Sequence, residues 1–107
     1  MKNWFWETSC QVIQALDWAP SYVVMADKYL ERLFGMFILP GYNEAGVPTV
    51  LALPHCSSVH TFGMKQHLDI VLIDGCGKVI ALHENVGPGC MVGDKRAELI
   101  LERFHVG

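Results

Sequence analysis

The strongest constraint on the fold is a pair of apolar, β-branched runs separated by a short segment that contains two glycines. Residues 68–74 and 78–83 form the runs, and Asp74-Gly75-Cys76-Gly77 joins them. β-Branched residues favour strands, and glycine adopts the positive φ angles that tight hairpin turns require. The sequence therefore predicts an antiparallel β-hairpin in this region.

Four other segments are predicted to be strands. Residues 49–53 form a buried run that Pro54 ends, and residues 22–26 are apolar and β-branched after Pro20. Residues 97–102 alternate with a period of two, although a short helix fits this segment as well. Residues 12–16 alternate imperfectly and are also interpreted as a strand.

A helix is predicted from Asp27 to Phe37. Asp27 is a good N-cap, and Pro40-Gly41 follows the segment as a stop signal. Leu33 and Phe37 fall on one face at helical spacing, so this face should pack on the sheet against Ile70 and Leu72. We therefore expect an α+β, β-rich fold: a curved, mostly antiparallel sheet, arranged as a sandwich or partial barrel, with one helix packed on it.

Length, charge and cysteine content limit the class of protein. The 107 residues suit a single soluble domain spanning residues 1–107, and 51% of them are hydrophobic. Eight Lys and Arg against eleven Asp and Glu, with no basic run, argue against nucleic acid as a partner. The longest uncharged apolar run, residues 33–39, is far shorter than a membrane span.

The cellular compartment is predicted from the N-terminus and the cysteines. The first residues contain no apolar stretch of signal-peptide length, because Glu7 and Gln11 interrupt it. The four cysteines contain no C-x-x-C pair and are most simply thiols in a reducing environment. We therefore expect a cytoplasmic protein.

Three stretches carry a resemblance to a known family. They are Ala26-Asp27-x4-Arg32-Leu33-x-Gly35-Met36, then Cys56-x-Ser58-Val59-His60-Thr61-Phe62-Gly63-Met64, then Leu68-Asp69-Ile70-Val71-x-Ile73-Asp74-x2-Gly77-x-Val79. From about residue 22 onward the chain resembles the domain-of-unknown-function family DUF192, in particular its His-Thr-Phe-Gly-Met branch. The resemblance implies a small, mostly β domain with a helix on a curved sheet, and it brings no accepted enzymatic activity.

The chain also departs from the family pattern in two places. Lys65-Gln66-His67 stands where an aromatic or Pro-containing turn is more usual, and relatives usually continue beyond the position of Gly107 into a further strand. The resemblance therefore leaves open whether a C-terminal strand is missing.

The central motif contains candidate metal ligands. Cys56, His60 and Met64 supply the thiolate, imidazole and thioether that suit Cu(I), or Zn²⁺ without the Met. The alternative is a packed cysteine, a hydrogen-bonded histidine and a core methionine, which is the commoner use of these residues. We favour the alternative and expect neither a metal nor another cofactor.

The same region contains a possible proton-transfer pair. His60, which Thr61 follows, and Asp69 could together move protons near neutral pH. Alternatively, Asp69 accepts hydrogen bonds from backbone N–H groups or pairs with Arg32, because a charge among apolar residues needs a partner. We favour this second interpretation.

These observations predict an uncharacterised, non-enzymatic binding or accessory module with a pocket near residues 56–69. The candidate binding residues are Arg32, Cys56, His60, Thr61, Met64 and Asp69. The partner would be a small molecule or a protein. The alternatives are a soft-metal-binding protein that uses the Cys-His-Met set and a small hydrolase or proton-transfer enzyme that uses the His-Asp pair.

Overall fold

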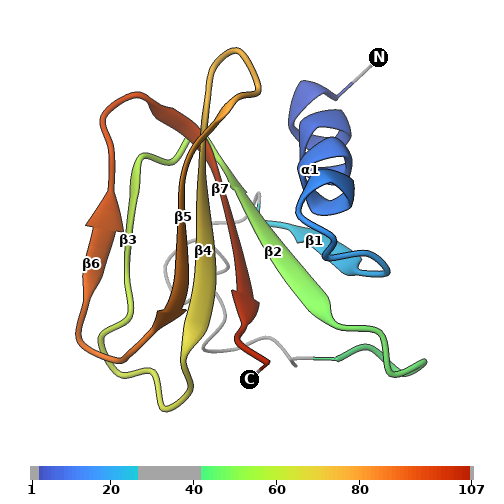
Figure 1. The fold of residues 1–107 in the computed structure, drawn as a ribbon, viewed down its shortest axis with the longest axis vertical. Coiled ribbons are helices and arrows are strands. Elements are labelled where there is room, and N and C mark those ends of the chain that lie inside the picture. The colour runs from blue at the N-terminus through green and yellow to red at the C-terminus, as the bar shows by residue number, and fades with distance from the viewer. Residues whose placement is uncertain (1–2, 27–41, 107) are drawn as a thin grey trace.

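A five-stranded sheet with the order β1-β2-β7-β4-β5 forms the centre of the structure (Figure 1). This structure is a computed structural model, and it describes residues 3–26 and 42–106. The strands of the sheet are β1 (Tyr22–Met25), β2 (Thr49–Pro54), β4 (Leu68–Asp74), β5 (Val79–Val86) and β7 (Ala97–Phe104). β1 and β2 are parallel and the other neighbours are antiparallel. A separate pair consists of β3 (Ser58–His60) and β6 (Met91–Gly93).

The predicted hairpin is confirmed as β4 and β5. The Asp74 N–H donates to the Lys78 carbonyl at 2.9 Å, and Gly77 has a φ of 85°. The Asp74 carboxylate accepts further bonds from the Cys76 and Lys78 N–H groups, both at 2.9 Å. These bonds hold the turn, because an aspartate side chain can replace a backbone acceptor there.

The predicted fold class is also confirmed. The strands expected at residues 22–26, 49–53 and 97–102 are β1, β2 and β7. Residues 97–102 all lie in β7, so the short helix that also fitted this segment is not formed. The described residues form a β-rich α+β fold whose sheet is mixed and does not close into a barrel. The predicted helix at residues 27–37, and with it the position of Leu33 and Phe37 relative to Ile70 and Leu72, lies outside the described residues.

The strand predicted at residues 12–16 is wrong. These residues form the end of a helix, α1 (Trp4–Ala15), and Leu16 is its C-cap. The Asn3 side chain accepts a hydrogen bond from the Trp6 N–H at 3.2 Å and caps the helix. Val12 and Ile13 are buried one turn beyond Thr8 and Ser9. The apparent alternation is therefore the end of a helical repeat.

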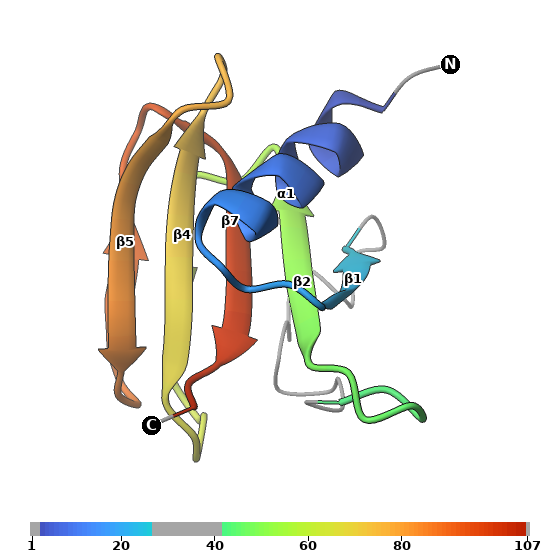
Figure 2. The same cartoon turned by 45° about the vertical axis from the view of Figure 1, so that its right-hand side comes forward.

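The two faces of the sheet bury two separate apolar clusters. On the first face α1 lies across β2 and β7 (Figure 2), and Val12, Ile13 and Trp18 pack on the sheet. On the opposite face the core includes Val92 of β6, and Val59 of β3 packs against it. The central strands β2, β4 and β7 are therefore buried on both sides.

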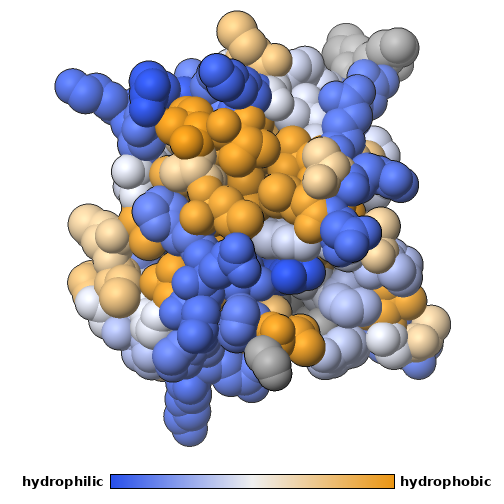
Figure 3. All heavy atoms as spheres, viewed as in Figure 1, coloured by the Kyte–Doolittle hydropathy of each residue, from blue (hydrophilic) through white to orange (hydrophobic). Residues whose placement is uncertain are grey.

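Hydrophobic and hydrophilic side chains occupy different parts of the surface. From the side seen in Figure 1, hydrophobic side chains gather in the upper part of the molecule over the sheet and toward α1, with hydrophilic residues around them (Figure 3). The part of the chain that the structure describes contains no helix long and apolar enough to cross a membrane.

The β3–β6 pair depends on a glycine with no room for a side chain. Gly93 pairs with Ser58, and a Cβ added at Gly93 would lie 2.6 Å from the Ser58 Cβ and 2.8 Å from the Ser57 carbonyl oxygen. We expect Gly93→Ala to lower the free energy of unfolding by about 1–3 kcal/mol, as overpacking generally does. Urea denaturation would measure the loss.

Gly75→Ala provides the matched control, because a Cβ there would meet only the Glu98 Cγ at an ordinary 3.5 Å. Its effect should stay within about 0.5 kcal/mol. Equal losses in the two variants would contradict the steric explanation for Gly93.

Candidate functional site

Thr61 connects the central motif to the rest of the fold. Its side chain is fully buried, and its Oγ1 donates to the Gly87 carbonyl at 2.7 Å. The same oxygen accepts a hydrogen bond from the Cys90 N–H at 2.8 Å, and the Thr61 N–H donates to the Cys90 carbonyl at 2.8 Å. Thr61 therefore attaches the segment after β3 to the loop before β6, with its hydroxyl proton committed to Gly87 and its side chain buried away from any ligand.

The predicted soft ligands lie in different surroundings. Cys56 and Met64 pack against the apolar cluster on the β3–β6 side of the sheet, and the Cys56 thiol donates to the Ser58 carbonyl at 3.2 Å. His60 is exposed on β3, and its ring stacks on Phe62 with centroids 5.0 Å apart. Because Val59 faces the core, the adjacent His60 points to the other side of the strand.

Possible metal ligands are not grouped elsewhere in the described part of the chain either. Within residues 3–26 and 42–106, no three His, Cys, Asp or Glu side chains are grouped so that they could hold a metal ion. All four cysteines lie in these ranges, and no disulfide joins any of them.

Asp69 is the centre of a buried polar cluster on the α1 side of the sheet. Its side chain is 1% exposed and accepts hydrogen bonds from the Asn85 N–H at 3.0 Å, the Arg103 Nε at 2.9 Å and the His105 Nδ1 at 2.7 Å. Desolvation alone would raise the pKa of Asp69, but these three bonds together hold that pKa below its ordinary value.

The cluster contains one predicted interaction and two residues that sequence reasoning missed. A backbone N–H does bond to Asp69, as expected. Arg32 lies outside the described residues, and the guanidinium that contacts Asp69 within them belongs to Arg103. The histidine in contact with Asp69 is His105, whereas His60 lies on β3 beside Phe62.

Neighbouring side chains fix the geometry of this cluster. The Arg103 guanidinium lies 4.0 Å from the centre of the Trp18 ring, a cation–π contact. His67 bonds through Nδ1 to the Asn85 side chain at 2.7 Å. In the neutral His105 ring, an Nδ1 that donates to Asp69 leaves Nε2 as an acceptor, whereas in the charged ring both nitrogens donate. The cluster holds Arg103 and His105 in place and could position a single proton-transfer group.

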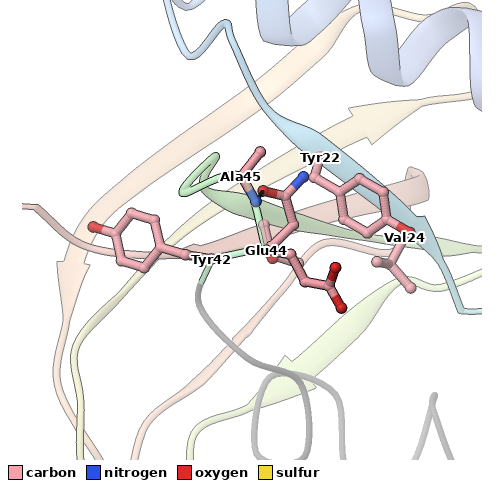
Figure 4. A pocket seen from close by; sticks show the side chains of 7 residues that line it. Tyr22, Val24, Tyr42, Glu44 and Ala45 are labelled. Atoms are coloured by element: carbon pink, nitrogen blue, oxygen red, sulfur yellow. Dashed lines mark hydrogen bonds between the residues drawn. The ribbon is translucent and has the colours of Figure 1, made fainter.

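A second region, on the sheet face opposite α1, is an open pocket of about 770 Å³. It lies between the start of β1, the start of β2 and the loop that precedes β2 (Figure 4). Its walls include Tyr22, Val24, Tyr42, Glu44, Ala45 and Thr49. Sequence reasoning missed this pocket, since it expected one near residues 56–69.

The loop that forms one wall is held by its own hydrogen bonds. The Asn43 side chain accepts from the Ala45 N–H at 3.0 Å and the Val47 N–H at 2.9 Å, and the Asn43 N–H donates to the Val47 carbonyl at 2.9 Å. The Tyr22 N–H then bonds the Pro48 carbonyl at 2.7 Å and joins the loop to β1. Glu44 is therefore carried on a constrained backbone.

Thr49 is an unusual member of the pocket wall. It is 2% exposed, yet its Oγ1 is buried with no hydrogen-bond partner among the described residues. A buried hydroxyl without a partner costs about 1–3 kcal/mol of stability. Tyr22 and Tyr42, by contrast, are about half exposed, at 51% and 53%. The pocket thus combines two accessible aromatic rings with one unsatisfied polar atom.

Comparison with known proteins gives the fold and nothing more. No family model matches the chain, and no curated protein matches it. A crystal structure of a protein of unknown function from Novosphingobium aromaticivorans DSM 12444 is similar, with a TM-score of 0.55 and 13% sequence identity. The match covers 79% of this chain and 62% of that protein, so this chain spans less than two thirds of its length.

Proposed function

We propose that this chain is a non-enzymatic binding module and that the pocket beside Tyr22 and Thr49 is its ligand site. The observation that carries the proposal is the buried, unpartnered Thr49 hydroxyl in the wall of an open pocket. A ligand that bonds this hydroxyl would recover hydrogen-bond energy that the free protein lacks. The volume of about 770 Å³ lies in the range of sites for small organic molecules.

The construction of the pocket supports the same proposal. The loop bonds of Asn43 hold the wall before any ligand arrives, so little ordering would accompany binding. Tyr22 and Tyr42 offer large rigid surfaces, which lose little conformational entropy on contact. The ligand would therefore be a small molecule, one of the two partner classes that the sequence predicts.

The resemblance to DUF192 and the cytoplasmic location belong to the same proposal. The resemblance is supported by the motif around His60 and Asp69, and that family has no accepted activity to transfer. A reducing compartment is supported by four cysteines that form no disulfide.

The first test needs no knowledge of the ligand. Thr49→Val replaces the unpartnered hydroxyl by a methyl group of similar shape, so we expect the free energy of unfolding to rise by about 1 kcal/mol. Thr61→Val is the matched control, because it removes a hydroxyl that makes hydrogen bonds at 2.7 and 2.8 Å. The control should lose about 1–3 kcal/mol. A loss of stability in both variants would remove the basis of the proposal.

Binding is then tested with small aromatic fragments of acidic, neutral and basic character, followed by two-dimensional NMR of the labelled protein. We expect fragments that bind to shift the amide signals of Tyr22, Ala45 and Thr49. The Tyr42→Ala substitution should make these shifts smaller. Phe62→Ala, which removes a ring that is 56% exposed but outside the pocket, should leave them unchanged. If no fragment shifts the pocket amides, the proposed function fails.

A further inference from the structure

The charge in the pocket indicates which small molecules it suits. Of the described residues that line it, Glu44 alone carries a charge. Figure 4 shows the Glu44 side chain between Tyr42 and Tyr22, with its carboxylate on the side of Val24. A negative group at this place repels anions and attracts cations.

The two tyrosines add to this preference. The face of an aromatic ring carries partial negative charge and attracts ammonium and guanidinium groups. Tyr22 and Tyr42 are each about half exposed, so a ligand can reach their rings. The pocket therefore offers the Glu44 carboxylate and the Tyr22 ring to the same ligand, whereas the Tyr42 ring points away from them (Figure 4).

The remaining polar atom distinguishes one cation from another. The Thr49 Oγ1 is buried in the pocket wall with two lone pairs and no described partner, so it would accept a hydrogen bond from a ligand N–H that reaches into the wall. A primary or secondary ammonium has such a donor, whereas a quaternary ammonium has none. Val24 and Ala45 add apolar wall that suits an alkyl or aryl group.

We infer that the pocket binds a small organic ammonium ion that has at least one N–H group and is joined to an apolar group. Glu44 balances the charge, the Tyr22 ring contacts the cation or the apolar group, and the Thr49 hydroxyl accepts an N–H, while Tyr42 forms the outer wall of the pocket (Figure 4). This inference rests on the proposed function, and it adds the ligand class.

The test uses four phenyl-bearing probes: two cations, phenethylamine and its N,N,N-trimethyl derivative, the neutral 2-phenylethanol, and the anion 3-phenylpropionate. Titrations followed by NMR of the pocket amides give each dissociation constant. We expect phenethylamine to bind at least about tenfold more tightly than the alcohol and the carboxylate. Added salt should weaken the binding of the amine and leave that of the alcohol unchanged.

Two variants separate the contributions to binding. Glu44→Gln should weaken phenethylamine binding about twofold to fivefold and leave 2-phenylethanol unaffected. Glu84→Gln, which changes an exposed glutamate on β5, is the control and should change neither. Thr49→Val should weaken the binding of phenethylamine and leave that of the trimethyl derivative unaffected, because the derivative has no N–H that could bond the Thr49 hydroxyl.

The outcomes distinguish this inference from the function on which it rests. If the alcohol or the carboxylate binds in the pocket as tightly as the amine, or if Glu44→Gln has no effect, the ligand class is wrong and the binding function stands. If the trimethyl derivative binds as tightly as the primary amine, the role of Thr49 toward the ligand is wrong. If no probe shifts the pocket amides, the ligand class is wrong, and if the aromatic fragments also shift none of them, the proposed function fails as well.

Discussion

The Glu102→Gln variant is expected to be more stable than the unmodified protein by about 3 kcal/mol near pH 8 and nearly equal to it near pH 4. Glu102 lies on β7 between Leu51 of β2 and Ile70 of β4, and its side chain is 4% exposed. Burial away from water raises the pKa of Glu102 from 4.5 to about 7. The charged carboxylate is therefore disfavoured in the folded state.

The direction of the pH dependence follows from that pKa. Between about pH 4.5 and 7 the unfolded chain loses the Glu102 proton while the folded protein keeps it. The folded state thus binds more protons, and the stability that Glu102 contributes below this window is lost as the pH rises through it. Glutamine cannot ionise, so the variant escapes this loss.

Urea denaturation of both proteins at several pH values would measure the difference. Glu98→Gln is the matched control, because Glu98 lies on the same strand and is exposed, so its effect should be small at every pH. A difference between Glu102→Gln and the unmodified protein that does not change with pH would contradict the explanation.

We expect Asp69→Ala to lower the free energy of unfolding by about 3 kcal/mol near pH 7. The substitution leaves Arg103, His105 and the Asn85 N–H without their shared acceptor. The loss should be near the low end for a buried ion pair, because the Arg103 and His105 side chains are 24% and 23% exposed and can be partly hydrated.

The pH dependence of this variant should have the opposite direction. The pKa of Asp69 is held below its ordinary value, so its stabilising contribution is present above that ordinary value and is lost as the pH falls. The difference in the free energy of unfolding between Asp69→Ala and the unmodified protein should therefore become smaller at acid pH. Asp94→Ala removes a partly buried aspartate, 26% exposed, whose partner Arg96 is 71% exposed, and should cost much less. Equal losses for the two variants would show that burial is not what matters.

The parts of the fold that could be predicted have local signals. The β4–β5 hairpin combines two apolar runs with a turn whose residues specify its geometry, so no distant contact is needed to recognise it. Residues 12–16 were misassigned because five residues are too few to separate a period of two from one of 3.6. Asn3, which caps α1, was the signal that could have identified the helix.

The sites depend on contacts that a single sequence does not specify. Asp69 could be identified because a charge in an apolar strand needs a partner, but its pairing with Arg103 follows from the β4–β7 register. Likewise, Tyr22 and Thr49 meet because β1 and β2 are parallel neighbours. Strand order and register arise from the whole chain, so these neighbours appear only once the sheet is assembled.

The position of β7 has a consequence for how the molecule acquires its structure. β7 separates β2 from β4 in the sheet, yet it follows both of them by more than twenty residues in the chain. The β4–β5 hairpin can form soon after its residues leave the ribosome, whereas β1 and β2 have no strand to join them to it until β7 is made. Within the described residues, a nascent chain that lacks β7 therefore has two unjoined strand pairs, and their open edges are templates for pairing with other chains.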